Sequence, residues 1–143
     1  MTEHVGASGV PAYTVMLIAL ALAKMRPELH VVLIEQGQSF GGNHIWSYFA
    51  SDILPEHRWL TAPLVTYGWS GYDVQFPAHS RSLDNIYYSI ESEHFDWVLR
   101  KELPASSLML GREVKAVSPR LVVLDGAQRI NAGGVIDARG AAD

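Results

Sequence analysis

A chain of 143 residues has the length of one domain with a modest core, since single domains commonly contain roughly 100–200 residues. The formal net charge is −4 without any cluster of Lys or Arg, so charge predicts neither nucleic acid nor an anionic membrane as a partner. Cysteine is absent, which excludes disulfides, thiolate metal sites and thiol chemistry. The six histidines include no pair at the i, i+4 spacing of a helical metal site, and we expect no metal.

The longest apolar run, Val15 to Ala23, is much shorter than the ~20 residues that a membrane-spanning helix requires. The segment before it contains Glu3 and neither Lys nor Arg, which argues against a secretory signal peptide. We therefore expect a cytoplasmic protein.

The amino-terminal segment, Met1 to Thr14, contains an incomplete dinucleotide fingerprint. A Rossmann start needs an apolar strand and then G-x-G-x-x-G at the start of a helix, because the amides and the helix dipole there hold a pyrophosphate. Val5 to Ala12 offers only two glycines, and Thr2 to Val5 is short and polar for a central strand. Tyr13 to Met25 predicts a helix that is apolar nearly all round and buried against a sheet, and Pro27 follows its end.

The apolar run Val31 to Ile34 predicts a buried parallel strand, because a strand that is covered on both faces has no reason to alternate. Glu35 follows at its carboxyl end, where a doubly wound sheet borders its ligand crevice and an acid can accept hydrogen bonds from ribose hydroxyls. Gly41 and Gly42 let backbone N–H groups approach an anion or a flat ring with no Cβ in the way. The alternative is that Glu35 is a solvated strand end and the two glycines form a turn.

Residues 49–91 combine aromatic side chains with short strands. A short helix is expected from Leu54 to Thr61, opened by Pro55. The predicted strands are Asp73 to Phe76, Arg81 to Leu83 and Tyr87 to Ile90. Each aromatic residue taken singly is expected to fill a core, whereas the group as a whole also fits an apolar substrate channel; the group is Trp59, Tyr67, Trp69 and Tyr72.

Residues 92–143 predict a helix followed by strands. Ser92 is expected to cap the helix, whose apolar stripe consists of Phe95, Val98, Leu99 and Leu103. Strands are expected at Ser107 to Leu110, Glu113 to Val117, Leu121 to Leu124 and Gln128 to Ile130. The turn signals between them, including Asp125-Gly126, predict a three-stranded antiparallel meander. Gly134 to Asp137 then predicts a last parallel strand.

Several segments resemble the bacterial lycopene β-cyclase family. Glu35 to Ser47 resembles the start of that family, where an acidic strand end is followed by Gly-Gly-Asn-His-x-Trp-Ser. Further matches keep the family's order, at His57 to Leu60, Ala62 to Val65, Trp69, Tyr72 to Pro77, Tyr87 to Ile90, Ser92 to Phe95 and Val135 to Gly140. The resemblance covers Leu17 to Gly140, which corresponds to the amino-terminal part of a family member.

The resemblance implies an α/β fold, a partial Rossmann-like FAD-binding domain of the glutathione-reductase type with a β-meander and a small antiparallel sheet insertion. The first βα(β) unit, with a degraded glycine loop, would occupy residues 1–48. An aromatic-rich insertion with short strands would occupy residues 49–91. The helix, the meander and the last parallel strand would occupy residues 92–143.

The same resemblance implies the contacts with FAD. Glu35 would bind the ribose. Val114 matches a position where flavoproteins of the glutathione-reductase-like type place backbone near the adenine, and Asp137 begins the second flavin-contacting motif. The complete expected cofactor-binding set is Glu35, Gly41, Gly42, Asn43, His44, Val114, Asp137, Arg139 and Gly140. The family keeps a cofactor-contacting arginine where this chain has His94, which donates fewer hydrogen bonds and is usually uncharged near neutral pH.

The family converts the acyclic ψ-ends of lycopene into β-ionone rings by protonation of a double bond, closure through a carbocation and loss of a proton. Reduced FAD, with NAD(P)H as the reductant, would stabilise the positive charge, and an apolar pocket would shield it from water. The family's catalytic glutamate motif lies downstream of the matched segment, so we assign no catalytic residue and expect this chain alone to be inactive. The lipophilic substrate would allow peripheral contact with the inner membrane.

Two other functions fit the same features. One is a fragment of an FAD-dependent oxidoreductase or monooxygenase, which would share Glu35, the meander and Val135 to Gly140. The string Gly41 to Ser47 distinguishes the two, because it resembles cyclases rather than flavoproteins in general. The other is a non-catalytic remnant, which the incomplete fingerprint and His94 favour.

Overall fold

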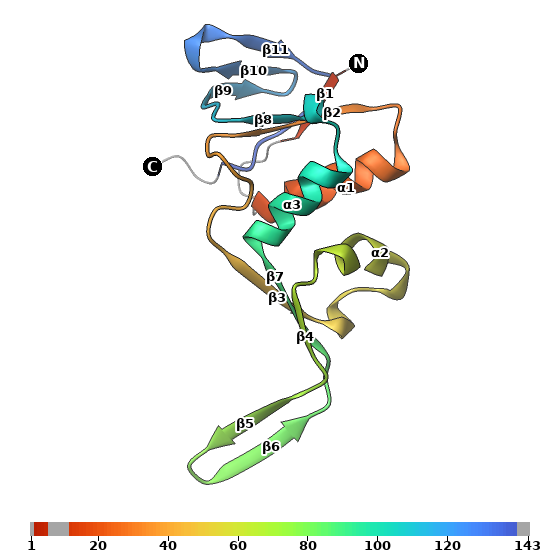
Figure 1. Cartoon of the computed structure of the whole chain (residues 1–143). Coiled ribbons are helices and arrows are strands. Elements are labelled where there is room, and N and C mark those ends of the chain that lie inside the picture. Colours follow the sequence, from red (N-terminus) through yellow and green to blue (C-terminus); the bar gives the residue numbers. More distant parts are fainter. Residues whose placement is uncertain (1, 6–11, 140–143) are drawn as a thin grey trace.

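The computed structural model describes residues 2–5 and 12–139. Its central sheet has four parallel strands and lies in the upper part of Figure 1, below the blue strands. In spatial order they are β12 (Val135–Ile136), β1 (Thr2–Val5), β2 (His30–Glu35) and β8 (Leu108–Leu110). Counted along the chain these are the fourth, first, second and third strands of the sheet, which is the order of half a doubly wound fold.

The place of β1 corrects the expectation that Thr2 to Val5 is unsuited to a central strand. β1 lies between β2 and β12 and pairs in parallel with both, with His4 opposite Val32 on one side and Val135 on the other. The ladder bonds come from the main chain, which every non-proline residue carries, so two neighbouring strands override an unfavourable composition. The predicted glycine fingerprint falls on residues 6–11, which lie outside the described part of the chain.

Two helices lie side by side beneath the sheet in Figure 1, α1 (Ala12–Met25) and α3 (Ser92–Glu102). Between them and the sheet lies the main hydrophobic core, to which α1 contributes Met16 and Ala19 and β2 contributes Leu33. The predicted apolar stripe of α3 is confirmed, since it is buried at Phe95, Val98, Leu99 and Leu103.

The predicted meander is confirmed. β9 (Val114–Ser118), β10 (Leu121–Leu124) and β11 (Arg129–Asn131) form an antiparallel sheet, drawn in blue at the top of Figure 1. The turn at Asp125-Gly126 closes by a 2.9 Å hydrogen bond from the Leu124 amide to the Gln128 carbonyl. The strand before the meander, β8, belongs to the parallel sheet instead.

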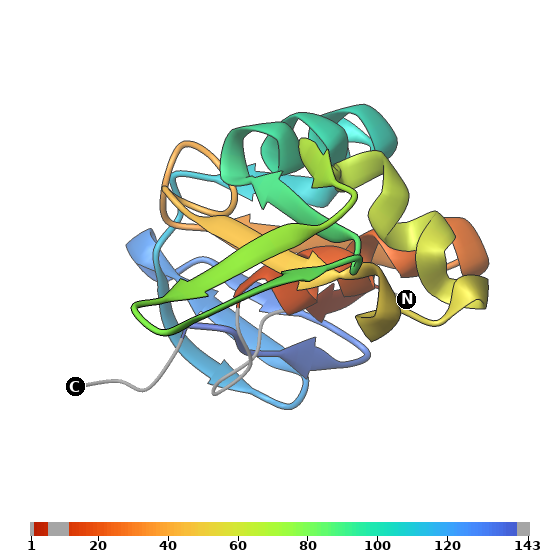
Figure 2. The ribbon, with the colours of Figure 1, turned by 90° about the horizontal axis from the view of Figure 1, so that it is seen from below.

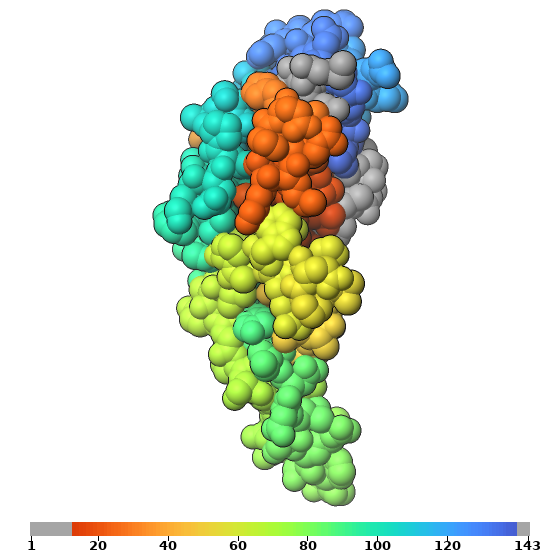
Figure 3. Space-filling model, turned by 90° about the vertical axis from the view of Figure 1, so that its right-hand side faces the viewer, coloured from red at the N-terminus to blue at the C-terminus, as the bar shows by residue number. Residues whose placement is uncertain are grey.

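A second region extends from this body, and Figure 2 shows it in front of the parallel sheet. Its sheet has the order β3 (Ile45–Phe49), β7 (Tyr87–Glu91) and β4 (Tyr67–Trp69), all antiparallel. A two-stranded hairpin follows, β5 (Tyr72–Phe76) and β6 (His79–Leu83). Figure 3 shows this hairpin as the narrow end of the molecule.

The sequence predicted β5, β6 and β7, and these three strands are confirmed. It did not predict β3 or β4 as strands. β3 includes residues on both sides of position 48, so the parallel unit and the aromatic-rich insertion share one strand. The helix expected at Leu54 to Thr61 is present as a 3-10 turn, Pro55–His57, which continues into α2 (Arg58–Thr61).

Candidate functional site

A cleft of about 640 Å³ opens at the carboxyl ends of β2 and β12, bordered by α1 and by the meander. Its volume is in the range of small-molecule and cofactor sites. Apolar side chains line its interior, and its polar lining residues include Glu35, Gln36, Arg112, Glu113, Asp137 and Arg139. Doubly wound sheets bind their ligands beyond the carboxyl ends of the strands, at the point where the strand order reverses.

The structure brings together most of the residues that the sequence predicted as a site. Five of them line this one cleft, from four separate segments of the chain, and they are Glu35, Gly41, Val114, Asp137 and Arg139. Gly42, Asn43 and His44 lie further along the loop after β2 and are not among its lining residues. Gly140 lies outside the described residues.

Glu35 is held in place at the end of β2. Its Oε1 accepts a 2.7 Å hydrogen bond from the Gly37 amide, and its own carbonyl accepts a 3.1 Å hydrogen bond from the Arg112 amide. The side chain is half-buried. The carboxylate therefore stands at the sheet edge in a defined position rather than as a freely solvated strand end.

Asp137 and Arg139 form a two-pronged ion pair directly after β12. Nε and Nη2 of the arginine each donate a 2.7 Å hydrogen bond to one carboxylate oxygen, and Nη1 donates a 3.0 Å bond to the Val114 carbonyl. The hydrogen bond from Arg139 lowers the pKa of Asp137 below its usual value, and the same contact raises the pKa of Arg139. One arginine thus links the last parallel strand to the first strand of the meander.

Arg112 is a lining residue that the sequence analysis missed. Its Nε donates a 2.9 Å hydrogen bond to Asp125 Oδ1 and its Nη2 donates one of 2.9 Å to Gln128 Oε1, so it fastens the turn of the meander to the cleft. The available signal was its position just after β8, at the same edge of the sheet as Glu35.

Gly41 and Gly42 have φ angles of +82° and +62°, which L side chains rarely adopt. A Cβ on Gly41 would lie 2.8 Å from the Trp46 indole and 3.3 Å from the Ser92 Cβ. The positive φ angles fit a sharp change of chain direction at this pair, and Gly41 also lines the cleft. The Trp46 ring in turn packs edge-on against Phe95, with centroids 5.7 Å apart.

His94 makes contacts away from the cleft. Its Nε2 is 3.0 Å from the Pro63 carbonyl oxygen, and its ring stacks on Trp97 with centroids 5.6 Å apart. His94 is not among the lining residues, and the expectation that it weakens the family's arginine contact with the cofactor stays a prediction.

The second region carries a ladder of aromatic rings. Successive centroids are 6.0 Å apart for Tyr67 and Trp69, 5.9 Å for Trp69 and Tyr87, 5.1 Å for Tyr87 and Phe49, and 5.7 Å for Phe49 and Tyr72. Tyr67 is 50% exposed and Trp69 is 47% exposed. The expectation that each residue of the group Trp59, Tyr67, Trp69 and Tyr72 fills a core is wrong for Tyr67, Trp69 and Tyr72, the last of which is 37% exposed. Alternate residues of a strand point to opposite faces, and Tyr67 and Trp69 lie on an uncovered face of β4.

Within residues 2–5 and 12–139 no group of three or more His, Cys, Asp or Glu side chains is placed to hold a metal ion. No helix in the same ranges is both long and apolar enough to cross a membrane.

Solved structures share this fold. The tetrameric form of 2-methyl-3-hydroxypyridine-5-carboxylic acid oxygenase matches with a TM-score of 0.67 and 14% identity, over 94% of this chain and 38% of that one. A Photorhabdus luminescens protein assigned as an FAD-containing monooxygenase matches with a TM-score of 0.55 and 15% identity, over 96% and 39%. The chain thus shares the mixed α/β fold of part of each of these two proteins.

Sequence relatives define the family. Residues 9–143 match the model of the lycopene cyclase protein family. The lycopene beta-cyclases of Pseudescherichia vulneris and Pantoea ananas are 45% and 39% identical over 125 residues, which is 87% of this chain. The chain belongs to the lycopene cyclase family. It spans 32% of the length of these two relatives.

Proposed function

We propose that this chain is the FAD-binding part of a lycopene β-cyclase, with the glutathione-reductase type of cofactor domain and with NAD(P)H as the reductant of the flavin. The observation that carries the proposal is the convergence of Glu35, Gly41, Val114, Asp137 and Arg139 on one cleft at the carboxyl ends of parallel strands. Family membership supplies the reaction, the formation of β-ionone rings from the ψ-ends of lycopene.

The cleft residues fit a dinucleotide. The fixed Glu35 carboxylate can accept hydrogen bonds from ribose hydroxyls, and the Val114 backbone borders the cleft where an adenine would lie. Asp137 and Arg139 present a charged pair beside Val114, because Arg139 donates a hydrogen bond to the Val114 carbonyl. When bound, reduced FAD would supply negative charge close to a developing carbocation.

The aromatic ladder is the surface that we assign to the polyene. Lycopene is long, flat and apolar, so consecutive rings can cover it without any hydrogen bond. The faces of Trp69 and Tyr87 carry the negative side of their quadrupoles, which favours a nearby positive charge. Ladder residues in this role would exclude water and orient the substrate; the proton donor is not among the residues that we assign.

The cofactor site is tested by FAD titration of the purified chain, with flavin fluorescence and the thermal midpoint followed together. A ligand that binds only the native state raises the midpoint, by the equivalent of about 2.7 kcal/mol at one hundred times its Kd. Glu35→Gln is expected to weaken FAD binding about 10-fold, since a neutral amide replaces a charged acceptor. Glu102→Gln, on the exposed end of α3, is the matched control and should bind normally. A chain that neither quenches FAD nor gains stability would contradict the proposal and favour the remnant interpretation.

The cyclase activity is tested in a chimera. This chain replaces the matching segment of the Pseudescherichia vulneris lycopene beta-cyclase, and the products from lycopene are separated with NAD(P)H present. β-Ionone rings formed without net oxidation are expected. Hydroxylated or oxidised products would favour the oxidoreductase alternative instead.

A further inference from the structure

The loop from Gln36 to His44 forms one wall of the cleft through Gln36, Phe40 and Gly41. Phe40 itself is 3% exposed and belongs to the hydrophobic core, so its side chain anchors the middle of the loop. At its start the loop is held by Gly37, whose amide donates to Glu35 Oε1 and whose carbonyl accepts a 2.9 Å hydrogen bond from the Gly111 amide. Further along, polar contacts come from α3, which is not among the elements that line the cleft.

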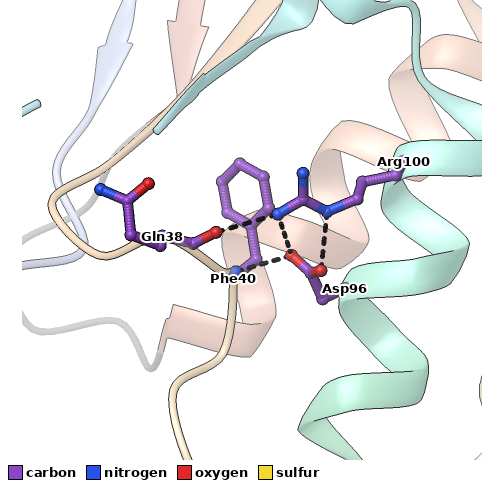
Figure 4. Close-up of polar contacts among 4 residues, drawn as sticks. All are labelled: Gln38, Phe40, Asp96 and Arg100. Atoms are coloured by element: carbon purple, nitrogen blue, oxygen red, sulfur yellow. Dashed lines mark hydrogen bonds and ion pairs between the residues drawn. The ribbon is translucent and has the colours of Figure 1, made fainter. Parts of the chain in front are cut away.

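Asp96 and Arg100, one turn apart on α3, hold the first half of the loop (Figure 4). The Asp96 Oδ1 accepts a 2.8 Å hydrogen bond from the Phe40 amide. Arg100 donates from Nε to Asp96 Oδ2 at 2.7 Å and from Nη2 to the Gln38 carbonyl at 3.0 Å. Asp96 thus binds a backbone amide of the loop and Arg100 binds a backbone carbonyl of the loop. The ion pair between the two side chains also holds each of them in place. Hydrogen bonds to charged groups are stronger than neutral ones.

Ser92, at the start of the same helix, holds the second half. Its Oγ accepts a 3.3 Å hydrogen bond from the His44 amide, and its own amide donates a 3.0 Å bond to the His44 carbonyl. This corrects the prediction that Ser92 caps α3, because Glu91 occupies the N-cap position and makes no side-chain cap. The two positive-φ glycines, Gly41 and Gly42, lie between the two points of attachment.

We propose that Asp96 and Arg100 are positioning residues, which keep the loop wall of the cleft in its ligand-binding shape through the backbones of Gln38 and Phe40 and without touching the ligand. This inference rests on the proposed FAD site. We call Asp96 and Arg100 together the clamp. If the loop is already fixed before binding, the ligand does not pay the entropy cost of ordering the loop, so the clamp raises the affinity for the ligand.

The test compares two substitutions on α3 that each remove one positive charge, at neighbouring positions. Arg100→Met removes the contact with the loop, whereas Lys101→Met removes the same charge one residue later, where the side chain is 61% exposed and paired only loosely with Glu102 at 3.9 Å. Arg100→Met is expected to weaken FAD binding about 10-fold and Lys101→Met less than about 2-fold. Arg100→Lys should give an intermediate affinity, because one ammonium can pair with Asp96 but lacks the two-pronged geometry.

Hydrogen exchange of the ligand-free proteins supplies a readout that is independent of FAD. The Phe40 amide and its loop neighbours should exchange faster in Arg100→Met, while the amides of β2 keep their wild-type rates. A uniform rise over the whole chain, or an FAD affinity equal to that of Lys101→Met, would overturn the positioning role and leave the FAD site standing. Failure of the wild-type chain to bind FAD would overturn the proposed site together with the positioning role, whatever the exchange rates.

Discussion

The body and the aromatic region of this chain use their side chains in opposite ways. In the body, charged groups such as Asp96 and Arg139 are tied to the backbone of distant segments, and the core is mainly aliphatic. In the aromatic region, Trp69 is 47% exposed, and its ring contacts the rings of Tyr67 and Tyr87. Aromatic density along a sequence therefore does not locate the core; here it marks a surface that is suited to an apolar partner.

The largest effect is expected in the core of the body. Leu99 is fully buried in α3, and Leu99→Ala should lower the free energy of unfolding by about 3–4 kcal/mol, since it leaves a cavity as well as removing apolar contacts. Urea unfolding measures the change. A loss below about 1 kcal/mol would mean that α3 is far less tightly packed than its burial indicates.

The next effect is expected at the loop between the two regions. Gly41→Ala adds a Cβ at positive φ and against Trp46, and should cost about 2–3 kcal/mol. Gly126→Ala is the matched control, because Gly126 has a φ of +66° but no heavy atom within 4 Å of the added Cβ. Its cost should be about 1 kcal/mol, from backbone strain alone. Equal costs in urea unfolding would show that crowding by Trp46 is unimportant.

A smaller effect is expected from acid at the end of β12. Arg139 holds the pKa of Asp137 below its usual value, so the pair stabilises the fold above the unfolded-state pKa and this stability is lost as the pH falls through the folded-state pKa. Because Arg139 is 44% exposed, the contribution is about 0.5 kcal/mol after solvent screening. When the free energy of unfolding is measured by urea at pH 7 and at pH 3, the wild type should lose about 0.5 kcal/mol more than Asp137→Asn over this range. Identical losses would argue that the pair contributes nothing.

The smallest effect on stability is expected in the aromatic ladder. Trp69→Ala should change the free energy of unfolding by less than about 0.5 kcal/mol, because the ring is half exposed, and should leave the FAD affinity unchanged. In the chimeric cyclase it should reduce turnover of lycopene. Loss of FAD binding in this variant would contradict the assignment of separate roles to the body and the aromatic region.

Local patterns predicted much of the fold, and long-range pairing explains what they missed. Val31 to Ile34 was identified from its unbroken apolar run and Glu35 from its place after that run, both of which are local properties. The clamp was not identified, because Asp96 and Phe40 are 56 positions apart and Arg100 and Gln38 are 62 apart. Ser92 was misassigned for the same reason, since a serine at a helix start predicts a cap unless a distant amide engages its hydroxyl.

The pairing of β1 with β12 has a consequence for the order of events during synthesis. His4 pairs with Val135, so the central position of the parallel sheet can be filled on both sides only after nearly all of this segment has left the ribosome. Closing such a long loop is entropically expensive and slow, whereas the β5 and β6 hairpin needs only neighbouring residues and can form much earlier. The nascent chain therefore exposes its aromatic strands before the cleft at the parallel sheet is complete, and holding chaperones would be most useful during that interval.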